Sequence, residues 1–235
     1  FSKLIHKNNN MLNEEILQFL RELITHNNRE WFHDNKKRFD TLWKGFGEEV
    51  QQLIERVSLF DKDVVGLEAK DCLFRIYRDI RFSNDKSPYK DHFGACITPH
   101  GGRNSDYGCY YLHICPERCV LAGGVWGPDP KLLKMLRRDV FDHFDEFSAI
   151  ISDPDFKATF GEPDGKELKR VPDGFPVDSP AAEYLKYKYY CVDKEIPDSF
   201  LTSDDWMERT AEIFEKMVPF NRFLNYTVDE YLGKD

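Results

Sequence analysis

The chain lacks long apolar segments and the short motifs that mark the common nucleotide-binding, hydrolytic and metalloprotease sites. No apolar run approaches the roughly 18–20 residues that a membrane-spanning helix needs, so we predict no association with a membrane. Residues 1–10 do not show the basic, apolar and small-residue pattern of a secretory signal, which favours a soluble, cytoplasmic protein. There is no Walker loop and no GxGxxG, GxSxG or HExxH motif.

The chain also lacks a net positive charge. Its 42 acidic residues outnumber its 33 basic ones, and the formal net charge of the 235 residues is −9. Binding to nucleic acid depends on neutralising phosphates with Lys and Arg, so we predict no nucleic-acid partner. The six cysteines belong to a chain with an ample core and no secretory signal, and we expect them to be reduced. His113, Cys115 and Cys119 do not have the spacing of a zinc motif, and we predict no metal site and no cofactor.

The periodicity of apolar residues predicts an α+β fold. Helical spacing begins at Asn13 and again at Asn27, where Glu30 completes a capping box. Residues 72–82, 93–98, 107–115, 119–125 and 185–192 have the composition of strands. Further helices are expected from Pro130 and after Ser203 or Asp204, the last one ending at Pro219. We therefore predict one domain over residues 12–235, with a mainly antiparallel meander packed by N-terminal and C-terminal helices, preceded by an extension over residues 1–11.

The richest chemistry lies between residues 73 and 93. From Arg75 to Lys90, five basic residues stand against two acids: Arg75, Arg78, Arg81, Lys86 and Lys90 against Asp79 and Asp85. In a strand Arg75, Asp79 and Arg81 share one face, while Arg78 lies among apolar side chains on the other. Guanidinium groups stay charged and bind carboxylates or phosphates through two parallel hydrogen bonds. The excess of positive charge in an acidic chain indicates a site for an anion.

Three hypotheses follow from this segment. In the first, Arg75, Arg81, Lys86 and Lys90 bind a small anionic molecule or an acidic peptide between walls formed by Tyr89 and Trp126. In the second, the protein is an enzyme for an anionic substrate, with Asp79, His92 or Tyr89 as the group that transfers a proton. In the third, the segment is only a scaffold, because exposed Arg–Asp pairs are common and contribute about 0–1 kcal/mol. Binding is favoured over catalysis, since no recognisable nucleophile accompanies the cations; the role of Arg78 and the oligomeric state stay open.

The same residues resemble the signature of a known family. Residues 74–79, followed by 81–83 and 85–90, are similar to the central motif of the DUF2461 family, a conserved hypothetical family of bacteria and fungi. Other matching pieces occur in the same order, at residues 28–32, 110–114, 123–126 and 168–172. The resemblance extends from about Leu12 to about Leu232 and implies a single domain. It implies no reaction, because no function is assigned to the family.

Overall fold

The fold is built on a four-stranded antiparallel sheet. The computed structural model describes residues 2–81 and 83–234, with side chains from Met11 onward. The strands are β1 (Phe93–Ile97), β2 (Cys109–Ile114), β3 (Cys119–Val125) and β4 (Tyr190–Ile196), in the order β1-β2-β3-β4. Each strand therefore pairs with the next one along the chain. Together with the helices, this meander confirms the predicted α+β class.

Helices precede the sheet, interrupt it before β4 and follow it. The α-helices before β1 are α1 (Ser2–Thr25), α2 (Arg29–Asp34), α3 (Lys36–Phe60) and α4 (Ala69–Cys72). Those between β3 and β4 are α5 (Pro130–Asp142), α6 (Phe144–Ser152), α7 (Pro154–Phe160) and α8 (Ala182–Leu185). The last ones are α9 (Asp198–Leu201), α10 (Trp206–Lys216) and α11 (Val218–Leu232). In the described part of the chain no helix is long and apolar enough to cross a membrane.

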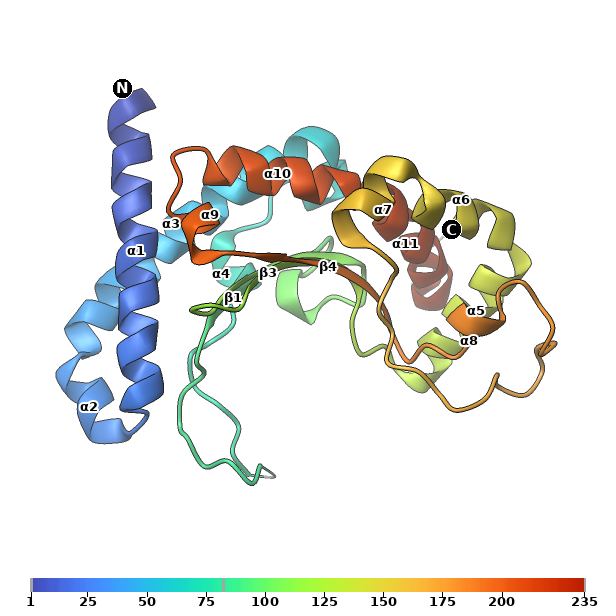
Figure 1. Ribbon diagram of the computed structural model, residues 1–235, viewed down its shortest axis with the longest axis horizontal. Helices are drawn as coiled ribbons and strands as arrows, with labels where there is room; N and C mark the ends of the chain where they lie inside the picture. Colours follow the sequence, from blue (N-terminus) through green and yellow to red (C-terminus); the bar gives the residue numbers. More distant parts are fainter. Residues whose placement is uncertain (1, 82, 235) are drawn as a thin grey trace.

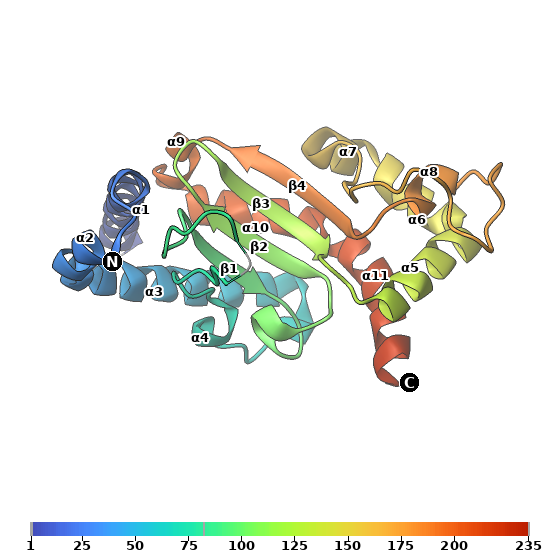
Figure 2. The same ribbon diagram turned by 90° about the horizontal axis from the view of Figure 1, so that it is seen from below.

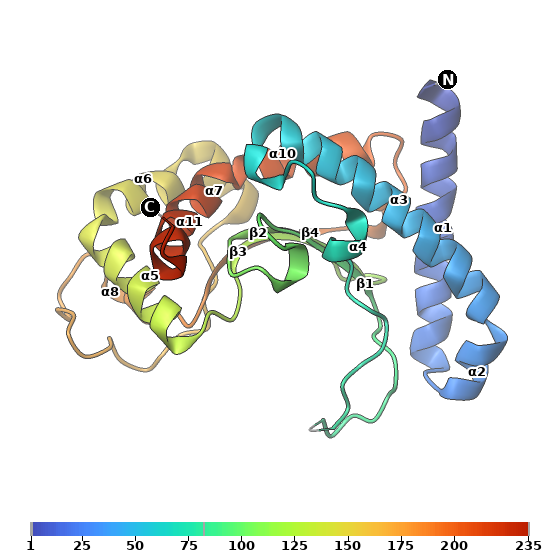
Figure 3. The same cartoon turned by 180° about the vertical axis from the view of Figure 1, so that it is seen from behind.

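The two faces of the sheet have different surroundings. Helices α3 and α10 lie across one face (Figure 1), and Tyr110, Leu112 and Ile114 of β2 are buried toward it. Tyr111 and His113 alternate with them and point to the opposite face, where both are half-buried. We call this second face the open face; Figure 2 shows it with α3 and α10 behind the strands. The segment between α4 and β1 projects from the sheet on this side (Figure 3).

The helix boundaries differ from the prediction at three places. Helix α1 begins at Ser2, well before the predicted start at Asn13. The long second helix is divided at Asn35 into α2 and α3, and Asn28 caps α2 by accepting a hydrogen bond from the Trp31 N–H. Pro219 lies in the first turn of α11 instead of ending a helix, because the N–H groups of a first turn need no helical partner. The division between residues 1–11 and 12–235 stays a prediction.

The predicted strand at residues 72–82 is wrong. Cys72 ends α4, and from there to Arg81 only isolated bridges occur, at Leu73 with Ala95 and at Tyr77 with Tyr89; Phe82 lies outside the described residues. The alternating pattern has another cause: Ile76 is buried and Leu73 packs on the core, while Tyr77 points to solvent. The fifth predicted strand begins at Tyr190 instead of Leu185, because residues 182–185 form α8.

Both edges of the sheet are covered. At the β1 edge the Phe74 N–H donates to the Gly94 carbonyl oxygen over 3.0 Å. At the β4 edge Asp164 and Cys191 exchange two backbone hydrogen bonds of 2.8 and 3.0 Å. Paired edges do not recruit strands from other chains, so the open face and its borders are the more informative surfaces.

Glu49 is an acid buried among the helices that cover the face of the sheet opposite the open face. It lies on α3, is 2% exposed, and neither of its side-chain oxygens has a hydrogen-bond partner among the described residues. Burial raises the pKa of Glu49 well above its ordinary value of 4.5, so the carboxyl group is held in its neutral form.

Replacing Glu49 by Gln should remove the fall in the free energy of unfolding that the buried carboxyl group causes as the pH rises. The folded protein holds the Glu49 proton more tightly than the unfolded chain does. The free energy of unfolding should therefore fall above pH 4.5 by up to about 1.4 kcal/mol per pH unit, until the folded pKa is reached. Urea unfolding of Glu49→Gln between pH 4 and 9 should lack this slope. Glu48→Gln, at an exposed neighbour paired with Lys44, should retain it; equal slopes in both variants would contradict the assignment.

Candidate functional site

Residues 73–92 form an irregular hairpin, here called the arm, whose two sides are held together by backbone hydrogen bonds. The Lys90 N–H donates to the Ile76 oxygen over 2.7 Å, and the Arg78 N–H donates to the Pro88 oxygen over 3.0 Å. Because of this pairing, the chain next to Arg75 lies beside Lys90. The base of the arm is joined to β1 through Phe74 and Gly94.

Tyr89 anchors the arm to the helices. The Asn27 side chain donates to the Tyr89 carbonyl oxygen over 3.0 Å and accepts from the Tyr89 N–H over 3.1 Å. The Tyr89 ring stacks on Phe32, with centroids 3.9 Å apart, and the residue is 5% exposed. Tyr89, which the sequence suggested as a pocket wall or as a group that transfers a proton, is buried in this structure and anchors the arm.

The predicted site cations at the tip of the arm already have local partners. The Arg81 guanidinium binds both Asp79 oxygens, with the shortest distance 2.6 Å, and these hydrogen bonds lower the pKa of Asp79 to about 2. The Lys86 ammonium donates to the Ile80 carbonyl oxygen over 3.1 Å. An Asp79 that stays ionised in an exposed ion pair is poorly suited to accept a proton near neutral pH.

Arg78 has a structural partner as well. Its guanidinium pairs with Asp85, and the Ser87 hydroxyl also donates to that carboxylate over 2.6 Å. The hydrogen bonds from Ser87 and Arg78 lower the pKa of Asp85. These contacts join Arg78 to the returning side of the arm.

Arg75 and Lys90 border a pocket at the β1 edge. The pocket has a volume of about 560 Å³ and is lined by Trp43, Lys70, Leu73, Phe74, Arg75, Lys90, Arg103 and Asn104. Four of these residues are cationic and none is acidic. Lys70 pairs with Glu68, and Arg103 donates to the carbonyl oxygens of Lys70 and Asp71 over 3.0 and 2.9 Å.

The other two cations of the pocket have no carboxylate partner within ion-pair distance among the described residues. Arg75 is exposed, whereas Lys90 is half-buried with its Nζ atom 5.1 Å from the centroid of the Phe74 ring. Burial and the nearby charge of Arg75 lower the pKa of Lys90. A cation kept in partial burial without a counter-charge costs free energy, which a bound anion would offset.

Trp126 is not part of this pocket. It is 72% exposed and lies just after β3, where its ring contacts Tyr189 beside β4 with centroids 4.3 Å apart. The arm borders β1, the strand at the opposite edge of the sheet. The aromatic wall near Arg75 is instead Trp43 of α3, a residue that the helical pattern assigned to the core.

His92 lies where the arm enters β1, within a chain of polar contacts. Its Nδ1 atom is 2.9 Å from Asp91 Oδ1, and Arg118 donates to Asp91 Oδ2 over 2.7 Å. On its other side the His92 ring faces His113, with centroids 4.2 Å apart. The Tyr111 hydroxyl lies 3.0 Å from His113 Nδ1.

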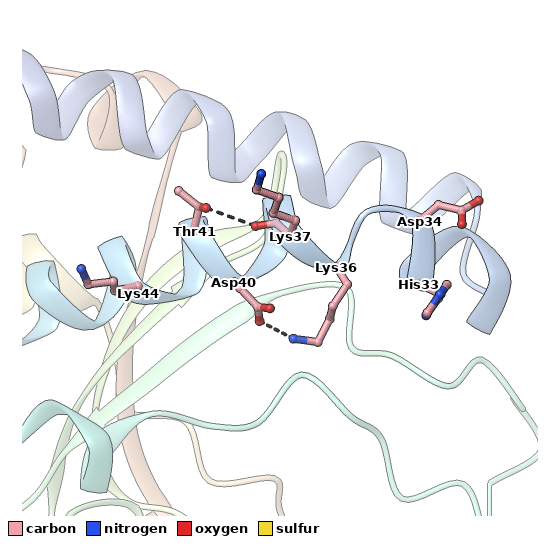
Figure 4. A pocket seen from close by; sticks show the side chains of 7 residues that line it. All are labelled: His33, Asp34, Lys36, Lys37, Asp40, Thr41 and Lys44. Atoms are coloured by element: carbon pink, nitrogen blue, oxygen red, sulfur yellow. Dashed lines mark hydrogen bonds and ion pairs between the residues drawn. The ribbon is translucent and has the colours of Figure 1, made fainter.

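A second, larger depression of about 710 Å³ lies on the outer side of α2 and α3. Figure 4 shows its side chains spread along the helices, with Lys36 and Asp40 joined to each other. Because Lys36 is paired with Asp40 and the other side chains are spread along the helices without converging, we do not consider it a binding site.

Comparison with known families agrees with the sequence motif. Residues 15–223 match the family described as conserved hypothetical protein DUF2461. The chain belongs to this family. No curated protein and no solved structure matches it. The DUF2461 match includes the arm, the pocket and the histidine pair, so all of the geometry above lies within the family domain.

The histidine pair should make this DUF2461 domain less stable in acid. Burial, reinforced by His92, lowers the pKa of His113 from 6.5 to about 4. The unfolded chain thus binds the proton more readily, and the free energy of unfolding should fall between pH 6.5 and about 4, by up to about 1.4 kcal/mol per unit. In denaturant unfolding, the free energy of unfolding of His113→Gln should fall less steeply with decreasing pH than that of the wild-type protein. His143→Gln, at an exposed position between α5 and α6, serves as the control; a wild-type slope in His113→Gln would refute the assignment.

Proposed function

We propose that this protein binds a small anionic molecule in the pocket between the base of the arm, α3 and α4. The observation that supports the proposal is the pairing of Lys90 with the backbone next to Arg75, which holds two cations without carboxylate partners at one pocket. Two further cations, Lys70 and Arg103, line the same pocket, in a chain whose net charge is −9. The field at this place opposes that of the molecule as a whole and attracts anions.

The dimensions and walls of the pocket favour a metabolite over an acidic peptide. Its volume of about 560 Å³ lies within the range of small-molecule sites, roughly 300–1,000 Å³. The Arg75 guanidinium can bind a carboxylate or phosphate group through two hydrogen bonds, and Lys90 supplies a point charge. Trp43, Leu73 and Phe74 offer apolar surface for the remainder of the ligand. The proposed ligand is an anion with a small apolar or planar part.

The proposal assigns different roles to the predicted site residues. Arg75 and Lys90 bind the ligand, whereas Arg81 and Lys86 maintain the tip of the arm through Asp79 and the Ile80 carbonyl group. Tyr89 contributes by anchoring the arm to α2.

Replacing Arg75 by Met should abolish most of the anion binding. Charge-assisted hydrogen bonds contribute about 1.5–3 kcal/mol each, so the affinity should fall roughly tenfold to a hundredfold. Thermal shift and calorimetry with inorganic phosphate, pyrophosphate, malonate and citrate would measure the loss. Lys90→Met should weaken the binding of the same anions.

Arg81→Met provides the matched control, because it removes a cation from the same arm at a position already bound to Asp79. This variant should bind the anions with wild-type affinity. The proposal fails if none of the four anions stabilises the wild-type protein, or if Arg81→Met loses as much affinity as Arg75→Met.

A further inference from the structure

His92 is held in a defined orientation by its neighbours. Asp91 Oδ1 lies 2.9 Å from His92 Nδ1, and the other oxygen of Asp91 accepts from Arg118 over 2.7 Å. A carboxylate accepts hydrogen bonds when ionised, so the Nδ1 atom carries the proton of the neutral ring. The Nε2 atom then keeps its lone pair, and no described residue forms a hydrogen bond with it.

The second histidine supports the first. The His113 ring lies against the His92 ring and is fixed in turn by the Tyr111 hydroxyl. Burial is the largest cause that lowers the pKa of both rings. Two adjacent imidazoles are therefore neutral near pH 7, which is the state required of a proton acceptor.

Gly94 leaves the space in which this arrangement fits. It pairs with His113 across the sheet, and a Cβ atom at this position would lie 2.9 Å from the Tyr111 hydroxyl oxygen and 3.5 Å from Phe74 Cδ2. A side chain here would displace the hydroxyl group that fixes His113. Glycine thus permits the close approach of Phe74, Tyr111 and His113.

Phe74 connects the histidine pair with the anion pocket. Its ring lines the pocket below Lys90 Nζ, and it also meets the edge of the Tyr111 ring with centroids 6.0 Å apart. Lys90 and His92 belong to the same side of the hairpin, and only Asp91 lies between them in the sequence. His92 is not among the residues that line the pocket, so a substrate bound at Arg75 and Lys90 reaches the imidazole only if it extends past Phe74.

We propose that His92 is a general base that removes a proton from an anionic substrate bound at Arg75 and Lys90. In this step the His92 Nε2 lone pair takes the substrate proton, an imidazolium ion forms, and the electron pair of the broken bond remains on the substrate. Asp91 stabilises the imidazolium ion, and the ammonium group of Lys90 stabilises the charge left on the substrate. Asp91, Arg118, His113 and Tyr111 are positioning residues. The inference rests on the proposed function for the location of the substrate.

The tautomer of His92 is the first test, and it needs no knowledge of the substrate. Nitrogen NMR of the imidazole groups at pH 7 should show His92 protonated at Nδ1 and bare at Nε2. A solvent-exposed histidine such as His33 on α2 should favour the Nε2–H form. Asp91→Asn should shift His92 toward the tautomer mixture of an exposed ring. Gly94→Ala should do the same to His113. If Nε2 of His92 carries the proton in the wild-type protein at pH 7, the general-base proposal is overturned.

The second test joins the base to the pocket. Phosphate or malonate added to the wild-type protein should move the His92 Nε2 signal, and Arg75→Met should abolish that movement while leaving the tautomer unchanged. If the anions bind by calorimetry and the His92 signal stays in place, His92 is not a base for that ligand, although the pocket stands. If no anion binds, the proposed function fails, and with it the substrate position assumed here, whatever the tautomer.

Discussion

The attachment of the arm to the edge of β1 is the constraint on which the candidate site depends. The Phe74 N–H satisfies the outward carbonyl group of Gly94, and the Asn27 side chain pairs with the backbone of Tyr89 in the manner of a neighbouring strand. An edge strand needs such a cover, and the arm supplies it through the contact of Phe74 with Gly94. Held at both points, the arm sets Lys90 opposite Ile76 and thereby beside Arg75.

The unequal faces of the sheet explain how neutral imidazoles come to lie close to fixed cations. Alternation in β2 sends Leu112 and Ile114 into the core and leaves His113 half-buried on the open face. Partial burial disfavours the charged ring there, while the exposed Arg75 keeps its guanidinium charge. Phe74 lies between the two environments, because its ring contacts both Lys90 and Tyr111.

Sequence patterns were sufficient for the class of fold and for the part of the chain that holds the cations. Four of the predicted strands occur as a meander, since alternation and turn residues are local signals. The pattern could not distinguish Arg75 from Arg81, because the partner of Arg81 lies two residues away and strand alternation places both arginines on one face. Trp43 and Arg103 are far from the motif in sequence, and only the packing of α3 and the loop after β1 brings them to the pocket.

The distribution of acids within the arm separates its tip from its base. Asp79 and Asp85 lie near the tip, and each neutralises an arginine there; exposed pairs of this kind contribute little free energy but fix local geometry. At the base, no described carboxylate lies within ion-pair distance of Arg75 or Lys90, and Lys90 is half-buried over Phe74. If the arm served only to cover an edge strand, neutral side chains at the base would cover it at lower cost. On the proposed function, a bound anion would offset the cost of these charges beside the cationic pocket.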